Sequence, residues 1–155
     1  MRLASKASIV VAIVAFAALA AAADAPPPAG WVDEPAREGS VRTLRHVESQ
    51  AGVDIARMQL SPDDVARFQR NLTTQLEGEG FEVEVPPSPT SVGGLTATMT
   101  RYTRTVLDIQ FTVLVVDVFH KNSLVHVVAW LRPTDDVTED ALEDDVLSMV
   151  TALVK

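Results

Sequence analysis

The sequence contains no cysteine, few aromatic residues and only three histidines. The absence of cysteine excludes disulfides, cysteine nucleophiles, thiol redox chemistry and cysteine-ligated zinc. It also excludes a lipoprotein leader, which ends at a lipidated cysteine. Aromatic residues make up 5% of the chain, and the sequence has no basic stripe or aromatic platform of the kind that binds nucleic acid.

Basic residues are scarce relative to acidic ones. The chain has 13 Lys and Arg against 21 Asp and Glu, which gives a net charge of −8 at pH 7. A domain this acidic repels phosphate backbones and anionic membrane surfaces. We therefore expect no nucleic-acid partner, and we find no motif that predicts a cofactor.

The first 23 residues are typical of a cleavable secretory signal peptide. Arg2 and Lys6 precede an uncharged apolar run, residues 9–23, and Ala21 and Ala23 supply the small residues that signal peptidase requires. A retained anchor is less favoured, because the run is shorter than the ~20 residues of a spanning helix. We expect cleavage after Ala23 and no stable membrane anchor afterwards. The mature chain would keep eleven basic residues against twenty-one acidic ones, a net charge of −10.

Residues 24–40 are rich in proline and alanine and predict a flexible tether, in which Trp31 is the residue expected to dock. The folded domain is expected over residues 41–155. The first part of this domain is predicted to form strands at residues 41–48 and 53–60. A helix follows, capped by Ser61 and started by Pro62, with apolar residues at steps of three and four.

Residues 81–85 alternate between apolar and acidic and predict a half-buried strand that ends at Pro86. The longest β signals follow at residues 95–103, 106–119 and 124–132. Lys121 and Asn122 predict a hairpin turn between the last two. The strand at 106–119 is apolar on both faces near that turn, which indicates a sheet covered on both sides.

A second helix is expected after Thr138, with a buried stripe at Leu142, Val146, Met149, Val150 and Leu153. The predicted fold class is therefore α+β, a single domain. It is a mostly antiparallel sheet of about six strands with helices packed on both faces, an α/β/α sandwich.

The small-residue turn Val92-Gly93-Gly94-Leu95, the long strands after it and the closing helix resemble the PsbP-like superfamily of small α/β/α sandwich proteins, which includes PsbP, DcrB and LpqN. The resemblance covers residues 41–153 and rests on the order of the elements. It implies a non-enzymatic accessory or binding role in the cell envelope. The missing lipid-bearing cysteine departs from DcrB and LpqN, which are lipoproteins.

The predicted hairpin places Asp117 opposite His126 on a largely apolar face. One interpretation is an acid/base dyad or half of a metal site. The other, which we favour, is a buried or rim ion pair that fixes strand register, because two groups without further ligands make no mechanism. We expect His46 and His120 to be surface residues, since zinc needs three or four converging ligands.

The acidic stretch 135–145 has neither the central glycine nor the oxygen spacing of an EF-hand. Complementarity to the helix dipole explains it better than a divalent cation site. With no catalytic, cofactor or metal residues assigned, the leading hypothesis is an exported soluble accessory protein of the bacterial envelope that is no enzyme and binds another protein. A small-ligand carrier with a groove between sheet and helix is the alternative.

Overall fold

The computed structural model describes residues 25–154, in which seven strands form one antiparallel sheet. Their order across the sheet is β1-β2-β3-β7-β6-β5-β4. The expected signal peptide, residues 1–23, lies outside the described residues. In chain order the elements are β1 (Trp31–Glu34), β2 (Arg42–His46), β3 (Gly52–Gln59), α2 (Pro62–Gly78), β4 (Glu82–Val92), β5 (Leu95–Val106), β6 (Ile109–His120), β7 (Ser123–Leu131) and α3 (Glu139–Val154).

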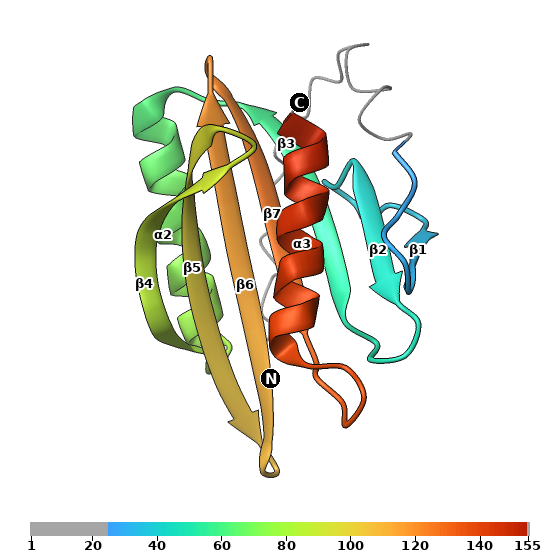
Figure 1. Cartoon of the computed structure of the whole chain (residues 1–155). Helices are drawn as coiled ribbons and strands as arrows, with labels where there is room; N and C mark the ends of the chain where they lie inside the picture. The colour runs from blue at the N-terminus through green and yellow to red at the C-terminus, as the bar shows by residue number, and fades with distance from the viewer. Residues whose placement is uncertain (1–24, 155) are drawn as a thin grey trace.

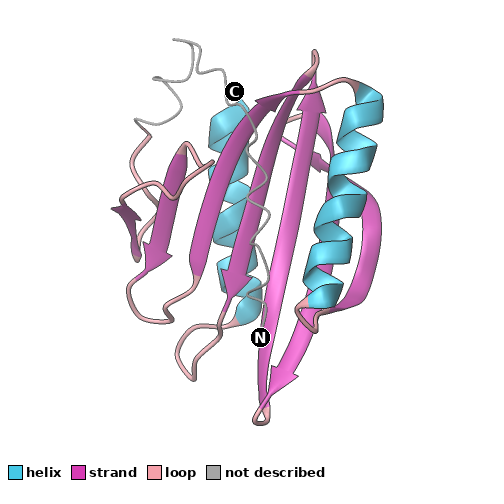
Figure 2. Ribbon diagram, turned by 180° about the vertical axis from the view of Figure 1, so that it is seen from behind, coloured by secondary structure: helices cyan, strands magenta, loops and turns pink. Residues whose placement is uncertain are grey.

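The two described helices cover opposite faces of the sheet. Helix α3 lies in front of the strands in Figure 1, and α2 lies in front of them in the reverse view of Figure 2. Between them, residues 112–118 of β6 are all buried, on both faces of the strand. This confirms the predicted α+β fold with helices on both sides, although the sheet has seven strands rather than about six. Neither helix of the described chain is long and apolar enough to cross a membrane.

Helix α3 packs on the face formed by alternate residues of the two central strands. Thr138 caps it as predicted, accepting the backbone N–H of Ala141 at 3.2 Å. The predicted apolar stripe faces the sheet, and full burial of each such side chain contributes about 1.5–3 kcal/mol. The stripe and the strand residues that it covers form one cluster, which includes Leu142, Val146, Met149, Val150, Leu114, Val116, Val127 and Ala129.

Helix α2 begins where the sequence predicts. The Ser61 hydroxyl accepts the backbone N–H of Asp64 at 3.2 Å, and Pro62 is the first helical residue. Its stripe packs on the other sheet face, where Val113 and Val115 of β6 are buried. The stripe is Val65, Phe68, Leu72 and Leu76.

The seventh strand, β1, comes from within residues 24–40, where a tether was expected. Trp31 docks as predicted, and its indole N–H donates to Asp145 of α3 at 2.9 Å. Residues 31–34 also pair with β2. This strand has no recognisable pattern in the sequence, because it is only four residues long and exposes Val32 and Asp33.

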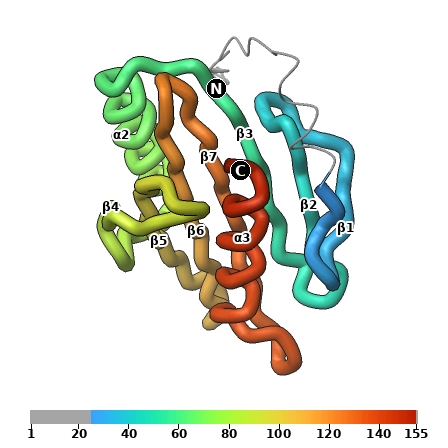
Figure 3. The backbone as a smooth tube through the Cα atoms, turned by 45° about the horizontal axis from the view of Figure 1, so that its top comes forward, coloured from blue at the N-terminus to red at the C-terminus, as the bar shows by residue number. Residues whose placement is uncertain are grey.

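Strand β4 continues beyond the point where proline was expected to end it. It runs to Val92, with irregular pairing to β5 on either side of Val85. Proline cannot donate a ladder hydrogen bond, but an edge strand needs such bonds on one side only. The expected half-burial is wrong as well, because Val83 and Val85 are both exposed. The β4–β5 turn then reaches the end of α3 (Figure 3), where a Cβ on Gly93 would lie 2.7 Å from Val154.

Gly30 and Gly39 allow a matched test of how closely the chain before β1 packs on β2. Both have a φ of +87°, where an L-residue costs about 1–2 kcal/mol. A Cβ at Gly30 would lie 2.8 Å from Nε2 of His46, whereas one at Gly39 would meet no described atom within 4 Å. We expect Gly30→Ala to lower the free energy of unfolding by at least about 1 kcal/mol more than Gly39→Ala, because His46 must shift. Urea unfolding measures the free energy of unfolding of both variants. An equal loss of stability in the two would contradict the close packing of Gly30 on His46.

Candidate functional site

The hairpin of β6 and β7 brings Asp117 and His126 together as predicted. Lys121 and Asn122 form its two-residue turn, with φ of +50° and +60°. This turn sets the register in which Asp117 lies directly opposite His126. Nδ1 of His126 lies 2.5 Å from Oδ1 of Asp117, and both residues are less than 10% exposed. Because a carboxylate only accepts, Nδ1 of the imidazole carries the proton of this hydrogen bond.

Helix α2 closes over the pair. Gln69 donates from Nε2 to the second carboxylate oxygen of Asp117 at 2.9 Å. The Phe68 ring stands edge-on to the His126 ring, with centroids 4.7 Å apart and planes at 87°. Gln69 is not among the site residues that the sequence predicts. The available signal was its place beside Phe68 on the helix face that turns toward the sheet.

The geometry favours a structural role for Asp117 and His126. Both carboxylate oxygens are already hydrogen-bonded within the protein, and Phe68 covers the imidazole. In the part of the chain that the structure describes, no group of three His, Asp or Glu residues could hold a metal ion. A buried hydrogen-bonded pair of this kind fixes which strand residues face each other, because any slip would leave its polar atoms unpaired.

The other two histidines differ in their surroundings. His120 is exposed at the β6–β7 turn, as expected. The surface position expected for His46 is wrong, because β1 covers it and leaves it 6% exposed. Its Nδ1 accepts the backbone N–H of Ser49 at 3.1 Å, and Trp31 packs edge-on against its ring. His46 therefore lies on the α3 side of the sheet with Trp31, while His126 lies on the α2 side.

The acidic stretch before and within α3 makes specific contacts inside the domain. Arg101 of β5 forms ion pairs with Glu139 and Glu143, and Asp145 accepts the Trp31 indole N–H. These three carboxylates hold the first half of α3 on the sheet. The sequence predicts only complementarity to the helix dipole, because these contacts join segments far apart in the chain.

A hollow of about 180 Å³ lies between α3 and the sheet, where the carrier alternative requires a groove. Arg42 is its one charged side chain, and it donates to both carboxylate oxygens of Asp33, at 2.6 and 3.0 Å. These hydrogen bonds lower the pKa of Asp33 below its ordinary value, against the opposing effect of burial. The hollow is otherwise mostly apolar, lined by Ala25, Pro26, Pro28, Ile55, Ser148, Met149, Ala152 and Leu153.

The other end of β6 carries an exposed apolar feature, which we call the β5–β6 finger (residues 104–111). Its turn residues are Leu107 and Asp108, with φ of +50° and +63°. Leu107 is 90% exposed, and Val106 and Ile109 beside it are also exposed. The sequence predicts a strand through residues 107 and 108, because leucine is apolar and gives none of the Gly or Asn signal of a tight turn. That prediction is wrong, since β5 ends at Val106 and β6 begins at Ile109.

Substitution of Asp117 separates a structural pair from a functional one. We expect Asp117→Ala to lower the free energy of unfolding by about 3–5 kcal/mol, because His126 then stays buried without its acceptor. Asp117→Leu combined with His126→Leu removes both partners and should be milder, since apolar replacement of a buried pair is often neutral. Urea unfolding of the two variants measures this. An Asp117→Ala protein of unchanged stability that had lost metal or ligand binding would support the dyad instead.

No family model matches the sequence, and no curated protein matches it either. Solved structures do share its fold. LpqN of Mycobacterium tuberculosis, described as involved in cell envelope biogenesis, gives a TM-score of 0.53 at 14% identity over 81% of this chain and 78% of LpqN. The cyanobacterial PsbP protein (CyanoP) of Synechocystis sp. PCC 6803 gives 0.56 at 13% identity over 81% of both chains. The resemblance noted from the order of the elements is thus confirmed at the level of the fold, and this protein has a PsbP-like fold.

Proposed function

We propose that this protein is an exported accessory protein of the cell envelope that binds another envelope or secreted protein and is no enzyme. The observation that carries the proposal is the exposed apolar end of the β5–β6 finger. Three neighbouring side chains there, those of Val106, Leu107 and Ile109, are exposed although the domain has an extensive core. Apolar side chains gathered at one exposed place are typical of a binding surface.

The energetics favour binding at this end. Removing apolar area from water contributes about 25 cal/mol per Å², so burying the Leu107 side chain in a partner would contribute about 1.5–3 kcal/mol. By contrast, the Asp117–His126 pair is covered by α2 and offers a substrate no open approach. LpqN, which shares the fold, is described as involved in cell envelope biogenesis, and the expected signal peptide would carry this protein out of the cytoplasm toward the envelope.

A small-ligand carrier is the second candidate, and the hollow beside α3 is the observation that favours it. Its volume of about 180 Å³ is smaller than the roughly 300–1,000 Å³ of typical ligand pockets. Arg42, which could orient an anionic ligand, is already bound to Asp33. These two facts favour the protein-binding function over the carrier.

Export can be tested at the N-terminus of the protein made by its natural host. We expect cleavage after Ala23, so mass spectrometry of the extracellular or periplasmic fraction should find a chain that begins at Asp24. The control is the same analysis of whole cells after inhibition of signal peptidase, which should preserve residues 1–23. A chain that keeps its first 23 residues in untreated cells would contradict export by cleavage.

Protein binding can be tested with the mature chain immobilised and exposed to envelope extract of the host. We expect at least one protein to be retained reproducibly and to be displaced by free mature chain. The carrier function is tested by native mass spectrometry of the chain purified from the host, which detects any small molecule that stays bound. A bound small molecule in that spectrum, together with no retained protein, would favour the carrier over the proposed function.

A further inference from the structure

The β5–β6 finger projects beyond the rest of the sheet. The last pair between β4 and β5 is Glu82 with Thr103, and the last pair between β6 and β7 is Thr112 with Leu131. Past these pairs, β5 and β6 bond only to each other through three more pairs that end at the turn. At about 3.3 Å per residue, the finger extends roughly 10 Å beyond its neighbours. Figure 1 shows its tip as the far end of the molecule, away from the β6–β7 turn.

The turn at the tip is unusual when compared with the turn at the opposite end of β6. Both are two-residue turns with two positive φ angles, the conformation that asparagine and glycine adopt most easily. The β6–β7 turn has Lys121 and Asn122. Both are polar and suit solvent, and asparagine also adopts a positive φ easily. The finger has Leu107 at the equivalent position of Lys121, where it is 90% exposed. Leucine there is favoured neither by the turn nor by packing within the fold.

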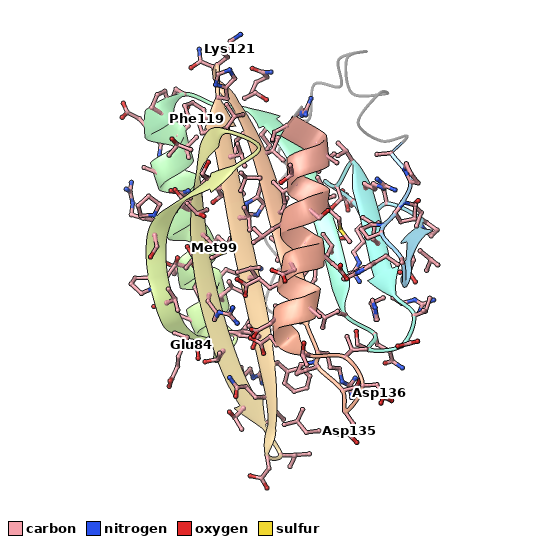
Figure 4. The ribbon with its side chains drawn as sticks, in the orientation of Figure 1. Glu84, Met99, Phe119, Lys121, Asp135 and Asp136 are labelled. Atoms are coloured by element: carbon pink, nitrogen blue, oxygen red, sulfur yellow. The ribbon has the colours of Figure 1, made fainter. Side chains whose placement is uncertain are left out.

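Acidic side chains outnumber basic ones around the tip. Asp108 is the second turn residue, next to Leu107. The β7–α3 loop, with the exposed residues Asp135 and Asp136, lies at the same end of the molecule (Figure 4). Two basic side chains lie at this end: Arg104, whose guanidinium lies over the ring of Phe81 at 5.9 Å, and Arg132, which is exposed at the start of the β7–α3 loop. The finger therefore presents an apolar tip together with acidic side chains.

We propose that Leu107 inserts into an apolar pocket of a partner protein whose rim carries lysine or arginine. This rests on the proposed protein-binding function and names the site and the partner's chemistry. The apolar tip selects a pocket, and the three aspartates select a basic rim through charge complementarity. An anionic membrane is disfavoured, because the same aspartates and the chain's negative charge repel it. The hollow of a second copy is disfavoured too, because its Arg42 is already bound to Asp33.

Site-specific photo-crosslinking in the host tests this proposal on the full chain. A benzophenone side chain at position 107 should form an adduct with one protein, whereas the same group at position 121 should not. The crosslinked peptide of the partner should contain apolar residues flanked by lysine or arginine. The adduct from position 107 should fall at least fivefold in cells that carry the additional change Asp108→Lys.

Binding of the captured partner to purified variants completes the test. Leu107→Asn suits the turn, so we expect an unchanged or higher Tm together with at least tenfold weaker binding. Lys121→Asn at the matched position should leave the affinity unchanged. Binding by wild-type chain should also weaken as salt rises, since the aspartates contribute.

Four outcomes would overturn the proposal in different ways. A partner that binds wild type and Leu107→Asn equally would refute the role of the finger and leave the proposed function standing. If no protein is captured, both the proposed role of the finger and the proposed protein-binding function are refuted. Leu107-dependent binding to vesicles of phosphatidylglycerol and phosphatidylcholine, or Leu107-dependent self-association in sedimentation, would assign the finger to a membrane or to a second copy.

Discussion

Residues 112–118 of β6 and 124–127 of β7 are buried on both faces of their strands, and the rest of the fold depends on that constraint. Apolar side chains on both sides of a strand must be covered on both sides, so the chain needs one helix for each face. The two helices cover their faces of the sheet in different ways. Helix α3 lies over an apolar face and is held at its first half by Arg101 and Trp31. Helix α2 lies over a face that also contains a polar pair, and it must satisfy that pair as well as cover it.

This difference explains why Gln69 lies where it does. A carboxylate beneath a helix loses its water, and each oxygen then needs a donor. His126 supplies one donor from the next strand, and Gln69 supplies the other from the covering helix. The hydrogen bonds of Asp117 thus link β6, β7 and α2. A slip of β7 by one residue, or a rotation of α2, would leave a buried oxygen unpaired, so the pair restricts the fold to one register.

The sequence was informative where a local pattern decides the structure. The Ser61 cap, the turn at Lys121 and Asn122 and the opposition of Asp117 and His126 follow from spacing alone, and the structure contains all three. Contacts between distant segments leave no such pattern. The Trp31–Asp145 hydrogen bond, which joins residues 114 positions apart, could not be read from either segment, and the burial of His46 depends on the same docking of β1.

The turn at Leu107 was missed for a different reason, and that reason bears on function. Turn signals exist because most turns serve the fold alone, so their residues suit the backbone and the solvent. The β6–β7 turn was found because Asn122 suits the backbone and both of its residues suit the solvent, although Lys121 has the same φ of +50° as Leu107. At the β5–β6 turn a leucine takes a left-handed conformation that costs an L-residue about 1–2 kcal/mol and then lies in water. A residue that opposes both the local backbone and its solvation is best explained by a contact outside the chain, since strain of this kind gathers where proteins bind or react. The position at which the sequence rule failed is thus the position at which we propose that the partner binds.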